Sequence, residues 1–213
     1  TAGDLIGASP LVSALFHDEP TVSLMGELGL ALNGVGNHEF DEGWAELSRM
    51  QHGGCHPVDG CVATEAFEGA DFTFLAANVT HEETGQTVFP ALEVRQFDGI
   101  DVGFIGLTFQ GTAGIVSQEG IQGLRFGPEA EAINSAVTEL KAEGVEAIVV
   151  LVHEGGRQIG GYDECQEMSG AIVELVEATD DAVDVFVTGH THKAYNCVLD
   201  GSIVTSAASY GRL

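Results

Sequence analysis

The chain is poor in basic residues. It has 7 lysines and arginines against 33 aspartates and glutamates, and its formal net charge is −26. Such a charge repels polyanions, which weighs against nucleic acid polymers or anionic membranes as partners. The sequence has no apolar run of about 18 residues, so we expect no membrane-spanning helix. Its hydrophobic content of 44% is nevertheless enough to bury an ordinary core.

The sequence also has no initiating methionine, and its first residues lack the basic and apolar segments of a secretion signal. Asp4 comes too early to follow a complete buried strand. We therefore expect a fragment or a processed product, with any export signal outside this chain.

Only four cysteines are present, and on paper they can pair in three ways. We favour Cys55 with Cys61 and Cys165 with Cys197, because a separation of six residues closes a short Gly- and Pro-rich loop that has no other obvious anchor. An even number of cysteines in loops suits an oxidising compartment. Four reduced thiols in a cytoplasmic enzyme remain the alternative. A zinc site is less favoured because no Cys-x-x-Cys segment occurs.

Apolar stretches and turn residues predict alternating strands and helices. Pro10 and Pro20 mark the starts of two short helices, and Asp98-Gly99 and Asp200-Gly201 predict hairpin turns. The remaining predicted elements are strands at 28–35, 72–77, 92–97, 102–107, 147–152 and 183–188, and helices at 44–50, 128–142 and about 169–179. This order predicts a layered α/β fold with mixed β-sheets flanked by helices.

Four short segments place metal ligands directly after apolar stretches: Gly3-Asp4, Gly36 to Asp41, Val152 to Glu154 and Gly189 to His192. In open α/β sheets, ligands bind beyond the carboxyl ends of the strands, so these segments can converge. One histidine after a strand is more often an ordinary hydrogen-bonded residue. Several histidines beside a carboxylate and an amide favour a centre for zinc, manganese, iron or nickel over calcium.

With these segments, and with Ala76 to Val79 and His153 to Gly156, the chain resembles the calcineurin-like metallophosphoesterase superfamily, and within it the secreted bacterial 5′-nucleotidase family. The resemblance covers residues 1–213 and implies a metallophosphoesterase catalytic domain. It implies that Asp4 bridges two divalent ions, manganese, zinc or similar. Asn37, His153 and His190 would complete one site, and His192 would belong to the other. His38 and Asp41 would be the catalytic pair.

The function implied by the resemblance is release of phosphate from nucleoside monophosphates by attack of a metal-bridged hydroxide. Such enzymes are secreted, extracellular or in the cell envelope. A 2′,3′-cyclic nucleotide phosphodiesterase, a broad sugar-phosphate hydrolase and a noncatalytic metal-binding module remain open alternatives. Members of the family begin with an Asp-x-His pair and continue into a substrate-binding domain, and neither is found in 1–213. We therefore expect an impaired fragment that retains one ion, and no substrate-binding residue can be named.

Other polar and aromatic residues receive simpler interpretations. Asp41 could cap the following helix, Asn78 could shape a turn or face the crevice, and Trp44 is expected to pack on its helix. Gly155 and Gly156 are expected to let the backbone pass close to the metals. The residues expected at the surface are His17, His52, His56, His81 and Arg157.

Overall fold

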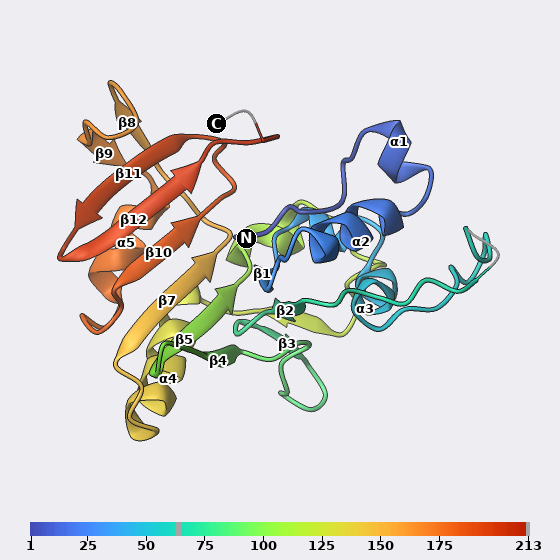
Figure 1. Cartoon of the computed structure of the whole chain (residues 1–213), viewed down its shortest axis with the longest axis horizontal. Helices are drawn as coiled ribbons and strands as arrows, with labels where there is room; N and C mark the ends of the chain where they lie inside the picture. The colour runs from blue at the N-terminus through green and yellow to red at the C-terminus, as the bar shows by residue number, and fades with distance from the viewer. Residues whose placement is uncertain (63–64, 212–213) are drawn as a thin grey trace.

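The structure is a computed structural model, and it describes residues 1–62 and 65–211 (Figure 1). A six-stranded mixed sheet has the order β11-β12-β10-β7-β5-β4. The four inner strands are parallel, whereas the edge strands β4 and β11 are antiparallel to their neighbours. The strands are β4 (Leu92–Phe97), β5 (Ile100–Leu107), β7 (Ala147–Val152), β10 (Val185–Thr188), β11 (Ala194–Leu199) and β12 (Ser202–Ala207).

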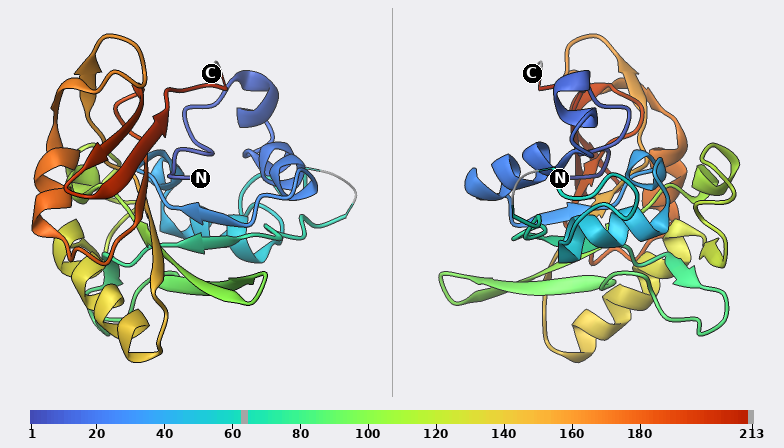
Figure 2. Two further views of the ribbon diagram at one scale, coloured as in Figure 1. Left: turned by 60° about the vertical axis from the view of Figure 1, so that its left-hand side comes forward. Right: turned by 90° about the vertical axis from the view of Figure 1, so that its right-hand side faces the viewer.

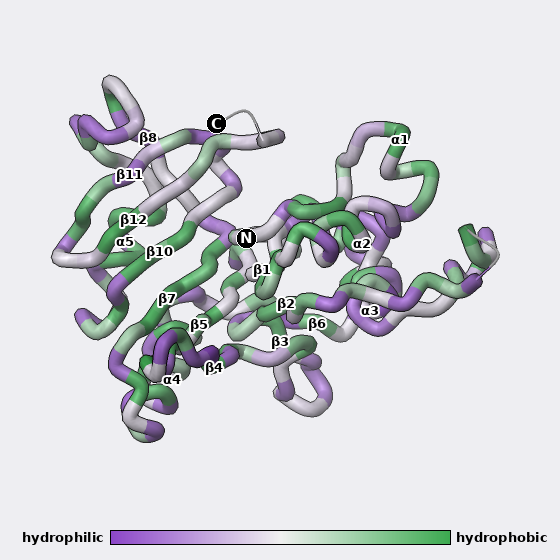
Figure 3. The backbone as a smooth tube through the Cα atoms, viewed as in Figure 1, coloured by the Kyte–Doolittle hydropathy of each residue, from purple (hydrophilic) through white to green (hydrophobic). Residues whose placement is uncertain are grey.

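Two helices, α4 (Glu129–Ala142) and α5 (Ala171–Ala178), cover one face of this sheet (Figure 2). The apolar face predicted for α4 is buried, with Ile133, Val137 and Leu140 fully inaccessible to solvent. They share a core with Val150 and other residues of the inner strands. Figure 3 shows hydrophobic residues concentrated along β5, β7 and β10, as strands covered on both faces require.

The opposite face is covered by a second layer. A parallel pair, β1 (Leu32–Gly34) and β2 (Thr73–Leu75), packs against the sheet through Leu32, Leu75 and Leu151. Gly106 permits this approach, because a Cβ there would lie 2.2 Å from the Cβ of Leu75. Beyond the pair lie α2 (Glu19–Glu27) and α3 (Trp44–His52), whose apolar residues form a separate core.

Shorter elements complete the described chain. β3 (Val79–His81) pairs with β6 (Leu124–Phe126), and β8 (Arg157–Ile159) pairs with β9 (Gln166–Ser169). The others are α1 (Leu11–Ala14) and the 3₁₀ helices η1 (His38–Phe40) and η2 (Gln110–Gly114). Both favoured disulfides, Cys55–Cys61 and Cys165–Cys197, are formed. Across the described ranges, no helix has the length and apolar character needed to cross a membrane.

The layered α/β fold predicted from the sequence is confirmed, but its first elements differ in extent. The strand expected over 28–35 is limited to Leu32–Gly34, because the C-terminal cap of α2 occupies its first residues. The amide of Leu30 donates to the carbonyl of Met25, and Gly29 has a φ of 85°, as in a Schellman cap. The helix expected at Pro10 is only four residues long.

Candidate metal centre

The centre lies where two parallel strands end beside the N-terminal segment. His153 follows the last residue of β7, and His190 lies two residues beyond the end of β10. These strands are neighbours in register, so their carboxyl ends share one edge, and their arrowheads point toward the N-terminus in Figure 1. The backbone of Thr1 is bonded to Leu32 and Gly34 on β1, which fixes the N-terminal segment at this edge.

Three predicted ligands meet at this edge. Asp4, His153 and His190 each offer one ligand atom, and all three atoms lie within 4.8 Å of one another. The Oδ2 atom of Asp4 lies 3.0 Å from Nε2 of His153. The buried Asn37 joins them, since its Oδ1 atom lies 3.0 Å from Nδ1 of His190. Four side chains from distant parts of the sequence therefore surround one position.

The buried imidazole of His153 has a nitrogen without a hydrogen-bond partner. Its side chain is 1% exposed, and Nδ1 lies 2.6 Å from the carbonyl oxygen of Ala2. We assign the ring hydrogen to Nδ1, because only a donor can bond to that carbonyl. In the neutral ring, which is the form that binds metal, the lone pair of Nε2 then faces the carboxylate of Asp4 at 3.0 Å. Two acceptors facing each other in a buried site are matched by a cation between them, so these residues fit a divalent metal.

The pKa values follow from this crowding. Burial lowers the pKa of His153, but the Asp4 carboxylate beside it raises the pKa more, so the net shift is upward. The pKa of His190 is lowered by burial and by the neighbouring His153. A neutral imidazole is the form that binds metal, so His190 is held ready as a ligand.

Glu39, which the sequence analysis did not single out, joins the two segments that carry Asp4 and Asn37 through hydrogen bonds. Its side chain is almost fully buried, and Oε2 accepts hydrogen bonds from the amides of Asp4 and Gly36 at 2.9 and 2.8 Å. Oε1 accepts from the amide of Leu5 and from the side-chain amide of Asn33. Burial and the charge of Asp4 raise the pKa of Glu39, whereas these donors favour its ionised form. The sequence feature that could have indicated a role for Glu39 at the centre was its position in the motif, directly after His38.

His38 and Asp41, the predicted catalytic pair, are in contact with each other. Nδ1 of His38 lies 2.7 Å from Oδ2 of Asp41, and both side chains are about one-third exposed. The amide of His38 donates to Oδ1 of Asp4 at 2.9 Å, which ties the pair to the centre. Burial lowers the pKa of His38, but the hydrogen bond to Asp41 and the charge of Asp4 raise it by more, so the net shift of this pKa is upward. The alternative role of Asp41 as a helix cap is wrong, because Gly43 occupies the N-cap position of α3.

His192 lies near the three-residue group but outside it. It lines the same cleft of about 410 Å³ as Asp4, His38 and His190, and its exposed ring packs edge-on to Tyr210 at 5.3 Å. Phe109, which the sequence analysis did not identify, stacks on His190 at 4.5 Å. This contact orients the His190 ring. No pattern around Phe109 in the sequence indicates it.

Several remaining expectations are settled by the contacts. Asn78 is buried and bonded through its side chain to the backbones of Thr108 and Gly127, so its role is structural. A Cβ on Gly155 would collide with the carbonyl of Gly189, so this glycine permits packing between two loops. Arg157 is exposed on β8, as expected.

The four remaining histidines divide into two pairs. His52 is exposed and His81 is half-buried at the edge of Trp44, which also packs against Phe89. The expectation that His17 and His56 are surface residues is wrong. Their side chains are 15% exposed, and their rings stack face to face at 3.9 Å. The stack joins residues 39 positions apart, which spacing in the sequence does not indicate.

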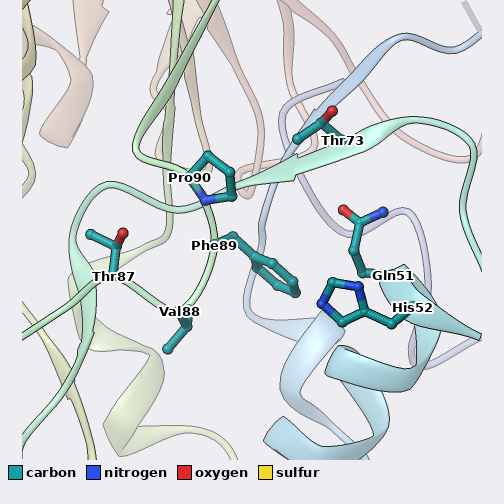
Figure 4. Close-up of a pocket in the computed structure, with 7 residues that line it drawn as sticks. All are labelled: Gln51, His52, Thr73, Thr87, Val88, Phe89 and Pro90. Carbon is teal, nitrogen blue, oxygen red and sulfur yellow. The ribbon is translucent and has the colours of Figure 1, made fainter. Parts of the chain in front are cut away.

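A second hollow, of about 460 Å³, lies away from the centre (Figure 4). It is lined by Gln51, His52, Thr73, Thr87, Val88, Phe89 and Pro90. Among these residues only His52 has an ionisable side chain, and the amide of Gln51 is already bonded to the backbones of Phe72 and Phe74. This hollow therefore lacks the grouped polar side chains of a reactive site.

Similar proteins were found among both sequences and structures, although no family model matches the chain. A Bacillus subtilis protein named Endonuclease YhcR is 40% identical over 99% of this chain and 17% of its own length. A Vibrio cholerae 5′-nucleotidase is 28% identical over 91% of this chain and 32% of its own length. The crystal structure of a 5′-nucleotidase precursor from Thermus thermophilus is 27% identical, with a TM-score of 0.76 over 99% of this chain and 39% of that one.

These likenesses agree with the fold and with the ligand set that the strand ends bring together. The six-stranded mixed sheet, its helices and its second layer form a metallophosphoesterase fold. In sequence the chain is similar to 5′-nucleotidases, and in fold it is similar to calcineurin-like phosphoesterases. The likeness to metallophosphoesterases, together with the grouped ligand residues, implies the use of divalent metal. The chain spans less than one-third of either curated relative.

Proposed function

We propose that this chain is the catalytic part of a metal-dependent phosphohydrolase that releases phosphate from nucleoside monophosphates. One observation carries the proposal: the unbonded Nε2 of buried His153 faces the carboxylate of Asp4, with His190 close to both. By the resemblance, Asp4 would serve two ions, and Asn37, His153 and His190 would hold one of them. Bound there, divalent ions would supply Lewis-acid stabilisation of the phosphoryl oxygens. Manganese and zinc both suit these ligands.

The protein's own residues then position the reaction. The amide of His38 holds one oxygen of Asp4, so the other oxygen remains turned toward His153. In our proposal, His38, supported by Asp41, would give a proton to the departing alkoxide, a contribution of about 10²–10⁴ in rate. In our proposal, His192 reaches the second ion from the rim of the cleft, where it lies.

We also propose that the protein acts outside the cytoplasm, in the cell envelope or beyond it. The two disulfides support this location, because such bonds persist in oxidising compartments.

Polynucleotide hydrolysis is the second candidate function, because a relative with 40% identity is named an endonuclease. The net charge of −26 opposes binding of a long polyanion, so we favour the small nucleotide as substrate.

The test compares hydrolysis of AMP, 2′,3′-cyclic AMP, a sugar phosphate and single-stranded DNA by the protein loaded with Mn²⁺. We expect measurable but impaired phosphate release from AMP, and we expect it to fall at least 100-fold in His153→Asn. The matched control is His52→Asn, which changes an exposed histidine and should leave the rate unchanged. Preferred cleavage of DNA would support the second candidate. Metal binding without hydrolysis of any substrate would support a noncatalytic module.

A further inference from the structure

A second group of side chains that could hold a metal lies beside the turn that carries His38 and Asp41. His17, Glu42, Glu46 and His56 each offer one ligand atom, and these atoms all lie within 4.8 Å of one another. His17 lies in the turn between α1 and α2, and His56 lies in the loop closed by Cys55–Cys61. Glu42 comes just before α3, and Glu46 lies in its first turn. We name these four residues the His17 cluster.

The charge of the surroundings suits a divalent cation. The carboxylates of Glu19, Glu42, Glu46 and Asp59 all lie in or beside the cluster, and Arg49 is the guanidinium that faces them. Arg49 bonds Glu46 at 2.6 Å and Glu19 at 2.7 Å, which neutralises only part of this charge. Each carboxylate oxygen of Glu46 keeps a second lone pair that can face an ion.

The two imidazoles are arranged around a carboxylate that can orient both. The rings of His17 and His56 are nearly parallel, with an interplanar angle of 8°. Oδ2 of Asp59 lies 3.1 Å from Nε2 of His17 and 3.5 Å from Nδ1 of His56. The other nitrogen of His17, Nδ1, lies 3.1 Å from Glu42. Metal-binding histidines commonly present one nitrogen to the ion and the other to such a carboxylate.

We propose that His17, Glu42, Glu46 and His56 form a second divalent-metal site, with Asp59 as the outer carboxylate of both imidazoles. Two imidazoles with carboxylates suit zinc, nickel or cobalt rather than calcium or magnesium. His17 binds through Nδ1 and donates from Nε2 to Asp59. His56 binds through Nε2 after its ring tilts out of the stack with His17, because an ion must lie near the plane of each imidazole that binds it. Its Nδ1 then donates to Asp59 instead of accepting from the amides of Val58 and Asp59 as it does without the ion.

The position of the site gives it a structural consequence. Glu42 directly follows Asp41, and a small cavity is lined by both of them together with His17 and His38. An ion held by the cluster therefore joins the disulfide-closed loop to the turn that carries the proposed catalytic pair. The loop and this turn are otherwise joined by the polar contacts of His17 with Glu42 and Asp59.

The test counts bound Co²⁺ by equilibrium dialysis, with visible absorption as a report on coordination. The protein is used with its first centre disabled by Asp4→Asn and His153→Asn. We expect this protein to retain one tightly bound ion, and to lose it when His17→Gln and His56→Gln are added. Replacing His52 by glutamine in the same background is the matched control and should leave the retained ion in place. Equal retention in the proteins with and without His17 and His56 would overturn the proposal.

Two single substitutions keep the test decisive if the double histidine variant fails to fold. Glu42 and Asp59 have exposed side chains, so their replacement should leave the circular dichroism spectrum unchanged. Glu42→Gln removes a ligand and should weaken the retained Co²⁺ at least tenfold. Asp59→Asn should weaken it about 10–100-fold, the usual effect of losing an outer carboxylate. Unchanged affinity in both variants would also refute the site.

Discussion

Glu39→Gln tests the idea that one buried carboxylate holds the metal-binding segments together. Glu39 accepts four hydrogen bonds, two at each oxygen, from Asp4, Gly36, Leu5 and the side chain of Asn33. A glutamine of the same shape replaces one oxygen by an NH₂ group, which leaves two of these buried donors facing another donor. Each unpaired buried donor costs about 1–3 kcal/mol, so the free energy of unfolding should fall by about 2–6 kcal/mol.

The assay is urea unfolding of the metal-free protein, followed by circular dichroism. The free energy should be compared only if the dependence on urea keeps the same slope, because that slope reports the surface exposed on unfolding. Glu83→Gln is the matched control, since it makes the same chemical change at an exposed position and should alter stability by no more than about 0.5 kcal/mol. A loss below about 1 kcal/mol in Glu39→Gln would refute the reasoning, because the four donors would then not depend on the carboxylate.

Three further predictions follow from contacts elsewhere in the chain. Cys165→Ala with Cys197→Ala should lower the free energy of unfolding by about 4 kcal/mol, and Cys55→Ala with Cys61→Ala by about 2 kcal/mol. The difference arises because the first disulfide joins residues 32 positions apart and the second joins residues 6 apart, so the first restricts the unfolded chain more. Equal losses in denaturant titrations would contradict this entropic account. Asp41→Asn should move the alkaline limb of kcat/KM to lower pH: His38 must be protonated to act as an acid, and the hydrogen bond to Asp41 helps to raise the pKa of His38 against the opposing effect of burial. An alkaline limb at the same pH in both proteins would exclude this role. Tyr195→Phe should destabilise the protein by about 1–3 kcal/mol in thermal or urea unfolding, because the buried amide of Gly156 loses its acceptor, the Tyr195 hydroxyl; a change within measurement error would mean that another group satisfies the amide.

The sequence predicted best those features that depend on local pattern. The hairpin of β4 and β5 follows from Asp98-Gly99, and β7 follows from a continuous apolar run that only a covered sheet can bury. The meeting of Asp4, His153 and His190 could be anticipated because parallel strands end at one edge. Their roles as ligands stay a prediction until a metal is located.

Features that depend on contacts between distant segments could not be predicted. Glu39 lies within a predicted ligand motif, but that position does not indicate that four donors would surround a buried carboxylate there. His17 and His56 lie in polar loops, and their stack exists because the disulfide-closed loop lies against the turn that precedes α2. The shortened strand β1 reflects the way α2 ends, where a cap at Gly29 competes with an apolar pattern that also suits a strand.

The most direct test of the metal centre is anomalous diffraction from crystals of this protein grown with Zn²⁺. The account predicts a peak at the edge of the sheet with Asp4, His153 and His190 as ligands, at the 2.0–2.2 Å that is usual for zinc. Zinc bound only at other positions, with Nε2 of His153 still facing Asp4 and no ion between them, would contradict the account.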